Sequence, residues 1–160
     1  MKHLLINYSF DCSEKGHIDP DFTHLVYGDS KLKGKSILNH ANPGSYAFFN
    51  TTINGIRYIT AYFYIDKILS IGKDDIEISN LKCSAREDEV IILGNRYNSK
   101  ILTHPLPLNK ELFISLDKFK DNEFKEGKSE LSTIASSTRS VVHLDEGDKN
   151  LLLEKCKNRG

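Results

Sequence analysis

The sequence predicts an α+β domain in which a small, twisted, mostly antiparallel β-barrel is flanked by helices. Residues 45–69 form an aromatic, β-rich run that is interrupted by a single Asn54-Gly55 turn. Strand-like segments lie before residue 108 and helical patterns after it, which is typical of α+β domains rather than of alternating βαβ units. The 160 residues contain no internal repeat and no low-complexity linker, so we expect residues 1–160 to form one domain.

The segments before residue 43 differ from one another in pattern. His3 to Tyr8 is a short apolar run and predicts a buried first strand. From Ser9 to Asn42 the periodicity is lost, and turn signals recur at Gly16, Asp19-Pro20, Gly28-Asp29 and Gly34. An irregular segment of this length in a compact domain is often functional.

The central segment predicts a β-hairpin. Ser45–Thr52 and Ile56–Leu69 would pair across Ile53-Asn54-Gly55, because an Asn-Gly pair tolerates the positive φ angles of a tight hairpin turn. Alternation in the second strand places Tyr58, Thr60, Tyr62 and Tyr64 on one face and Ile59, Ala61, Phe63 and Ile65 on the other. We expect the apolar face to line the barrel interior and the tyrosines to face a helix or a ligand.

The remaining elements follow from shorter patterns. Strands are predicted over Glu89–Gly94 and Ser99–Thr103, and the acidic residues 74–77 predict a hairpin tip. Helices are predicted over residues 109–120, where Asn109 is the cap and Leu112, Leu116 and Phe119 form the apolar face, over residues 129–137, and over residues 145–157.

Composition excludes several classes of protein. The 22 basic and 22 acidic residues cancel, so non-specific binding of a polyanion should be weak and any nucleic-acid role must use a local patch. Cys12, Cys83 and Cys156 form no Cys-x-x-Cys pair, which argues against a disulfide framework or a zinc site and favours a reducing, cytoplasmic location. No apolar run approaches the roughly 20 residues needed to cross a bilayer, and the first seven residues do not read as a signal peptide.

Catalytic motifs are missing from the sequence. It has no phosphate-binding Gly-x-x-x-x-Gly-Lys-Ser/Thr, no Gly-x-Ser-x-Gly, and no His-x-Glu combined with Cys-x-x-Cys. We therefore expect a non-enzymatic domain without cofactor or metal. The alternative that stays open is a nucleotide- or nucleic-acid-modifying enzyme that uses Asp11, Asp29 and His24 or His104.

The order of several motifs resembles a known family. Pro43-Gly44-Ser45-Tyr46-Ala47-Phe48-Phe49-Asn50 is followed by Asn54-Gly55 and by Tyr58-Ile59-Thr60-Ala61-Tyr62-Phe63-Tyr64-Ile65. This order resembles the PUA-like superfamily, which includes the EVE, YTH and ASCH domains. Leu4–Asp11, residues 19–29, Glu89–Asn95 and Ser99–Leu108 are similar to its prokaryotic nucleotide-modification-associated members. The resemblance covers residues 3–108, with a weaker echo at Ser137-Thr138-Arg139.

The resemblance implies a domain that reads a modified or flipped base in DNA or RNA, with modified DNA favoured over RNA. Such a domain serves as the specificity module of a nuclease or an AAA+-type motor, as in restriction systems, so the chain would be the N-terminal module of a larger protein or would bind a separate effector. The sequence has no tryptophan, so Tyr or Phe would have to stack on the base. A protein-interaction domain that uses Tyr58, Tyr62 and Tyr64 is a further alternative.

Two sets of candidate site residues follow. Polar side chains at strand ends can read a base edge, and exposed rings can stack on it; the expected base pocket consists of Asn7, Tyr8, Ser9, Asp11, Tyr27, Phe49, Asn50, Asn95 and Tyr97. We expect Phe49, Asn50 and Tyr97 to be the best exposed of them. Basic residues near turns can contact phosphates; these are Lys31, Lys33, Lys35, Arg57, Arg96, Lys100 and Arg139.

Overall fold

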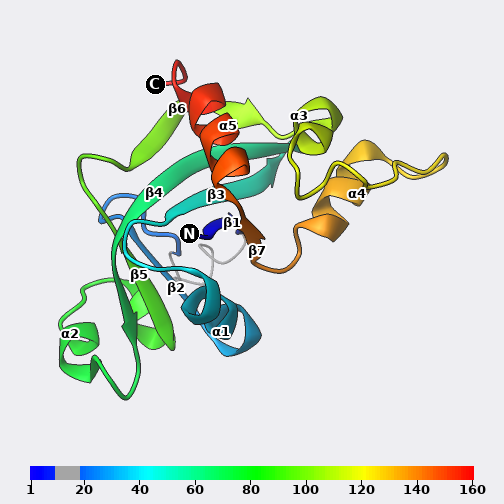
Figure 1. The fold of residues 1–160 in the computed structure, drawn as a ribbon. Coiled ribbons are helices and arrows are strands. Elements are labelled where there is room, and N and C mark those ends of the chain that lie inside the picture. The colour runs from blue at the N-terminus through cyan, green and yellow to red at the C-terminus, as the bar shows by residue number, and fades with distance from the viewer. Residues whose placement is uncertain (10–18) are drawn as a thin grey trace.

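The computed structural model describes residues 1–9 and 19–160, and these residues form an α+β fold with one mixed, mostly antiparallel sheet (Figure 1). The strands are β1 (His3–Asn7), β2 (Val26–Asp29), β3 (Tyr46–Ile53), β4 (Ile56–Ser70), β5 (Val90–Gly94), β6 (Lys100–Pro107) and β7 (Val142–Leu144). The helices are α1 (Lys31–His40), α2 (Asp75–Ser79), α3 (Lys110–Ser115), α4 (Glu130–Ser137) and α5 (Glu146–Cys156), with one 3₁₀ turn, η2 (Ser84–Glu87).

The sheet is open, so the predicted closed barrel is wrong, although the α+β class and the mostly antiparallel pairing are confirmed. The strand order is β2-β5-β4-β3-β1-β7, and β6 pairs with β4 outside this path. Closure would need a ladder between the two ends of that order, and none joins β2 to β7. At that end of the sheet, β1 pairs parallel with β3 on one side and antiparallel with β7 on the other. β7 has only three residues and is the last strand in the order.

The central hairpin is confirmed. β3 and β4 pair antiparallel from Tyr46↔Tyr64 to Ile53↔Ile56. Asn54 and Gly55 form the turn with φ angles of 49° and 78°, the left-handed region that this pair of residues tolerates best. The fifteen-residue β4 has β3 along one edge and both β5 and β6 along the other, so it is the strand on which the sheet is built.

An irregularity in β4 changes which side chains share a face. Against β3, Phe49 pairs with Ala61 and Asn50 pairs with Ile59, so Thr60 is the extra residue of a bulge. Against β6 the register also shifts between Ile59 and Ala61. Ile59 consequently packs in the same core cluster that Tyr62 covers, whereas the Thr60 hydroxyl meets the Tyr8 hydroxyl at 2.7 Å. The prediction that all four residues Tyr58, Thr60, Tyr62 and Tyr64 share one face is therefore wrong.

Two large hydrophobic cores cover the two faces of the sheet, and a third, smaller cluster at α2 and η2 consists of Val26, Leu69, Ile78, Ala85 and Ile91. The α1 face carries the core in which helix α1 packs, formed mainly by Leu4, Ile6, Tyr27, Ile37, Ala47, Phe49, Ala61, Phe63, Ile65 and Ile92. The α5 face carries the core under helices α3, α4 and α5, formed mainly by Leu5, Phe48, Ile59, Leu106, Leu112, Phe113, Ile134, Leu144, Leu152 and Cys156. β1, β3 and β4 contribute to both cores, because successive side chains of a strand point to opposite faces.

Helix α1 and strand β2 lie in the segment that the sequence predicted to be irregular. Only Gly34 and Ile37 of α1 are buried, so its lysine-rich sequence shows little apolar periodicity. A Cβ on Gly34 would lie 3.0 Å from the Asp29 carbonyl oxygen, so the glycine lets α1 approach β2 closely. That approach brings the helix N-terminus beside the end of β2.

The other predicted helices and turns have mixed outcomes. The helix predicted over residues 109–120 spans only Lys110–Ser115, yet Leu112, Leu116 and Phe119 are buried as expected. The final helix is confirmed, and its cap, Asp145, accepts a hydrogen bond from the Asp148 amide at 2.9 Å. The acidic residues predicted as a hairpin tip instead begin α2, and β7 was not predicted.

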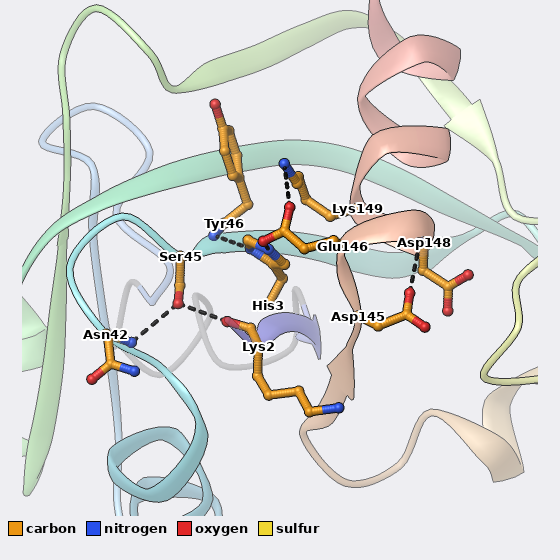
Figure 2. A network of polar contacts seen from close by, with 9 residues as sticks. All are labelled: Lys2, His3, Asn42, Ser45, Tyr46, Asp145, Glu146, Asp148 and Lys149. Atoms are coloured by element: carbon orange, nitrogen blue, oxygen red, sulfur yellow. Dashed lines mark hydrogen bonds and ion pairs between the residues drawn. The ribbon is translucent and has the colours of Figure 1, made fainter.

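A polar network ties the start of β1 to β3 and α5 (Figure 2). The Tyr46 amide donates to Nδ1 of the buried His3 at 2.9 Å, and the other ring nitrogen lies 2.7 Å from Glu146. Since Nδ1 accepts, the proton of a neutral ring sits on Nε2 and is donated to the carboxylate. Burial lowers the pKa of His3, so the imidazole serves as a neutral connector.

No helix among the described residues has the length and apolar character needed to cross a membrane.

Candidate functional site

The predicted strand-end residues lie together at the C-terminal ends of β1 and β3. Asn7 and Asn50 are register partners of this parallel pair, and the Tyr8 amide donates to the Asn50 carbonyl at 3.0 Å. The Thr51 hydroxyl donates to the Tyr8 carbonyl at 2.7 Å, and Lys33 from the first turn of α1 lies 3.4 Å from Oδ1 of Asn7. Asn7 and Tyr8 are half-buried and Ser9 is exposed, so this end of the sheet is accessible at β1.

Two of the expected pocket residues are closed off from solvent. Phe49 and Asn50 are both fully buried, so the expectation that they are exposed is wrong. The Phe49 ring packs against Tyr27 and Phe63, and the Asn50 amide donates to the Ile6 carbonyl at 3.0 Å. These two residues therefore support the end of the strand from inside the core, and the groups that solvent can reach are those of Asn7, Tyr8 and Ser9.

An acidic centre, which we define as Asp19, Asp29 and Asp88 with the Tyr27 hydroxyl, lies around β2. Both Asp19 carboxyl oxygens accept from the Gly28 amide, at 3.1 and 3.2 Å, and this carboxyl also hydrogen-bonds Asp88. The Tyr27 hydroxyl donates to Asp29. All three carboxyls are half-buried, whereas Tyr27 is only 5% exposed.

The protonation of the acidic centre is unusual. Burial raises the pKa of Asp19 to about 9, and the neighbouring charges of Asp88 and Asp29 act in the same direction, whereas the Gly28 amide opposes it. Burial, with the Asp29 charge as the next cause, also raises the pKa of Tyr27 well above its ordinary value. A protonated Asp19 can donate a hydrogen bond, whereas the oxygens of the neighbouring carboxyl groups can accept one, so the centre offers both kinds of hydrogen-bonding group.

The N-terminus of α1 connects the acidic centre to the strand end. The Ser30 amide donates to Asp29 at 2.9 Å, and the Ser30 hydroxyl donates to Asp88 at 3.1 Å. Lys33, one turn further along the same helix, is the residue that reaches Asn7. Aromatic rings continue from the strand end into the core: the centroids of the Tyr8 and Phe22 rings are 5.5 Å apart, and those of Phe22 and Phe49 are 5.8 Å apart.

Gly28 allows the close approach that the acidic centre needs. A Cβ at this position would lie 2.6 Å from Oδ2 and 2.8 Å from Cβ of Asp88. Contacts this short would force β2 away from the η2 turn that holds Asp88. Glycine is therefore required for the Asp19 and Asp88 carboxyls to meet.

The predicted phosphate-binding residues are dispersed. Lys31 and Lys35 are exposed on α1 and Arg139 is exposed after α4, whereas Arg57 is only 8% exposed. The Arg57 guanidinium donates to the hydroxyls of Thr52 at 2.9 Å and Thr138 at 2.8 Å, so it joins β4 to the end of α4. Arg57 is thus an internal connector and not a surface cation.

The loop at residues 95–100 lies at the other end of β3. The Asn95 amide donates to the Tyr64 carbonyl at 2.7 Å, and Tyr64 pairs with Tyr46, the first residue of β3, whereas Asn50 lies toward its last. The structure therefore does not bring Asn95, Arg96, Tyr97 and Lys100 to the Asn7 end. The predicted exposure of Tyr97 is confirmed, because the side chain is 87% exposed.

Sequence reasoning missed Asp19 and Asp88, and it considered Asp29 only for the enzymatic alternative. Asp19 stood within a turn signal and Asp88 in a charged loop, and nothing in the linear pattern joined them. Of the other enzymatic candidates, His24 is exposed and lies 2.8 Å from Asp21. His104 is also exposed; its amide donates to the Arg159 carbonyl at 2.9 Å, and its carbonyl accepts from the Arg159 guanidinium at 3.5 Å. Asp11 lies outside the described residues.

No protein-family model matches the sequence, and the search of curated proteins finds no match either.

Proposed function

We propose that this domain binds nucleic acid and reads one extruded base at the acidic centre and the adjoining Asn7 end of β1. The observation that carries the proposal is the group of three half-buried carboxyls around β2, Asp19, Asp29 and Asp88, in which burial raises the pKa of Asp19. A base edge presents both donors and acceptors, and a half-buried site that offers both can discriminate between bases. Perturbed carboxyl groups of this kind also occur preferentially at functional sites.

The surrounding charges suit a nucleotide. Negative charge on this group of carboxyls would repel a phosphate, whereas the carboxyl oxygens can accept hydrogen bonds from a neutral base. Lys31 and Lys35 are exposed on α1, the helix whose N-terminus adjoins the centre, and could contact the flanking phosphates. The resemblance of residues 3–108 to PUA-like base readers agrees with this proposal. Under this proposal, the chain gives specificity for modified DNA to a nuclease or an AAA+-type motor, which is either a separate partner or a domain fused to it.

The test uses short oligonucleotides that each contain one modified or mismatched base, with binding measured by fluorescence anisotropy. Asn7→Ala and Asp29→Asn should each reduce the preference for the best base, at a cost of about 1–3 kcal/mol, because a base donor or acceptor is left without a partner. Asp121→Asn, an exposed acid far along the chain, is the matched control. If both variants keep the selectivity of the wild-type protein, the proposal is wrong.

The contact between the Asp19 and Asp88 carboxyls favours a second candidate, a nucleotide- or nucleic-acid-modifying enzyme. Two aspartates that share a proton can serve as general acid and general base in one reaction. Mass spectrometry of the bound oligonucleotides after prolonged incubation distinguishes the two functions. An unchanged oligonucleotide supports the reader, and a product that Asp19→Asn abolishes supports the enzyme.

A further inference from the structure

A cluster of tyrosines lies on the α5 face of the sheet, the face opposite α1. Tyr46, Tyr62 and Tyr64 are half-buried on the neighbouring strands β3 and β4, with ring centroids 5.9 Å apart for Tyr46 and Tyr62 and 5.2 Å apart for Tyr46 and Tyr64. The bulge at Thr60 is the reason that Tyr58 is not part of this cluster. We call these three residues the tyrosine surface.

The hydroxyl groups of the tyrosine surface are unused within the described part of the chain. None of the three makes a hydrogen bond to another described residue. The tyrosines on the α1 face differ, because the Tyr8 hydroxyl bonds to Thr60 and the Tyr27 hydroxyl bonds to Asp29. A cluster of aromatic rings whose polar ends have no protein partner is typical of surfaces that bind other molecules.

Basic residues border the tyrosine surface on two sides. On the α5 side, the Lys149 ammonium lies 5.6 Å from the Tyr46 ring centroid and 2.9 Å from Glu146 (Figure 2). On the other side, Lys100 is the register partner of Tyr62, and the Tyr64 amide donates to the Ser99 hydroxyl at 3.0 Å. The loop that begins at Asn95 therefore stands at the edge of the surface.

The loop adds an exposed ring and a further cation. Tyr97 and Arg96 are both exposed at its tip, and the Asn95 side chain accepts from the Tyr97 and Asn98 amides at 2.9 Å, which fixes the turn. The acids nearby already have partners within the protein, since Asp66 accepts a hydrogen bond from the Asn95 side-chain amide at 3.1 Å, and Glu146 lies within bonding distance of His3 and Lys149. The cations Arg96 and Lys100 have no such acidic partner within the described residues.

We propose that the tyrosine surface, together with Tyr97, Arg96 and Lys100, binds single-stranded nucleic acid, with bases on the rings and phosphates on the cations. Stacking on aromatic rings combined with bordering cations is how sheets hold single strands. A duplex keeps its bases paired and stacked, so the rings would not reach them. The inference rests on the proposed nucleic-acid role but not on the acidic centre, which lies across the sheet.

Tyrosine fluorescence tests this directly, because the sequence contains no tryptophan. The wild-type protein is titrated with a ten-nucleotide oligothymidylate and with a duplex of the same length. We expect quenching and tighter binding of the single strand. Tyr62→Leu and Tyr64→Leu should weaken binding about tenfold each, and Arg96→Ala and Lys100→Ala should each reduce the salt dependence by about one phosphate contact.

Tyr58→Leu is the matched control, because Tyr58 is a half-buried tyrosine of the same strand outside the surface. If Tyr62→Leu and Tyr64→Leu bind oligothymidylate as tightly as this control does, the inference is overturned. It is also overturned if the wild-type protein binds no single strand, which is the result expected if another protein occupies the surface. Asn7→Ala and Asp29→Asn should keep their affinity for oligothymidylate. Loss of base selectivity in these two variants alone supports the acidic centre, whereas loss of oligothymidylate binding in the tyrosine variants alone supports this surface.

Discussion

At the residue scale, Asp19 links the candidate site to the stability of the domain. Its pKa is about 9 in the folded protein, against an ordinary value of 3.8, chiefly because the group is buried. A folded-state pKa above the unfolded one means that the folded protein holds the proton more tightly. The stabilisation from this group is complete below about pH 4 and is lost as the pH rises toward 9.

Asp19→Asn should therefore remove the loss of folding stability that accompanies ionisation of Asp19 as the pH rises. An amide can donate to Asp88 as the protonated carboxyl does, and it cannot ionise. We expect the variant to be more stable than the wild type at pH 8, by about 1 kcal/mol or more, and to lose less stability between pH 5 and pH 8. Urea unfolding at the two pH values measures this, with Asp121→Asn as control. Parallel stability–pH curves for the variant and the wild type would show that Asp19 is ionised in the folded protein.

Gly28 has a different role, since it decides whether the acidic centre can form. The Cβ of Gly28→Ala would press on the Asp88 side chain, so we expect a loss of about 1–3 kcal/mol in stability together with loss of base selectivity. Gly72→Ala is a control for the substitution itself, because nothing lies within 4 Å of a Cβ there, although its φ of 84° carries a backbone cost. A Gly28→Ala protein that keeps base selectivity would mean that contact between β2 and Asp88 is not needed for binding.

At the element scale, one buried hydrogen-bonded pair helps to attach the end of α4 to β4. The fully buried Thr138 accepts from Arg57 at 2.8 Å and donates to the Ile134 carbonyl at 2.9 Å. Removing the acceptor leaves a guanidinium hydrogen buried without a partner, whereas removing the guanidinium leaves Thr138 bonded to Ile134. Loss of the Thr138 hydroxyl should therefore reduce the free energy of unfolding more than loss of the Arg57 guanidinium does.

We expect Thr138→Val to lower the free energy of unfolding by about 1–3 kcal/mol, and Arg57→Met to lower it less. The double variant should be less destabilised than the sum of the two, since the orphaned group is gone. Urea unfolding gives all three values, and Ser136→Ala, at an exposed position of α4, controls for the helix. A larger loss for Arg57→Met than for Thr138→Val would contradict the assignment.

Local chemistry explains which elements could be predicted from the sequence. The β3–β4 turn is encoded by Asn54 and Gly55, and the start of α5 by Asp145, because each signal acts within a few residues. Helix α1 lacks such a signal, since one glycine and several lysines leave only Ile37 to mark its buried side. Its position depends on β2 and β5, which the sequence order alone does not place beside it.

At the scale of the whole molecule, what could not be predicted depends on contacts between distant segments. The sheet ends at the short β7, which pairs with β1 and not with β2, and the bulge at Thr60 is defined by the pairing of β4 with β3. The acidic centre joins Asp19, Asp29 and Asp88 through tertiary structure, so no spacing rule would find it. The strand-end residues Asn7 and Tyr8 were predictable, because polar residues where a strand ends are a local pattern.

The two cores should unfold together. β1, β3 and β4 contribute side chains to both faces of the sheet, so neither core can be lost while the other stays intact. We expect one urea transition with the same midpoint by far-ultraviolet circular dichroism and by tyrosine fluorescence. Separate midpoints would show that the helices on the α5 face form an independent unit.

The central claim is that a nucleic-acid base binds at the acidic centre, and amide chemical shifts test it most directly. An oligonucleotide with an extruded modified base is titrated into the ¹⁵N-labelled protein. The account predicts the largest shifts at Asn7, Tyr8, Gly28 and Ser30, the last two because their amides donate to Asp19 and Asp29. Binding that leaves these four amides unmoved and shifts residues elsewhere would contradict the claim.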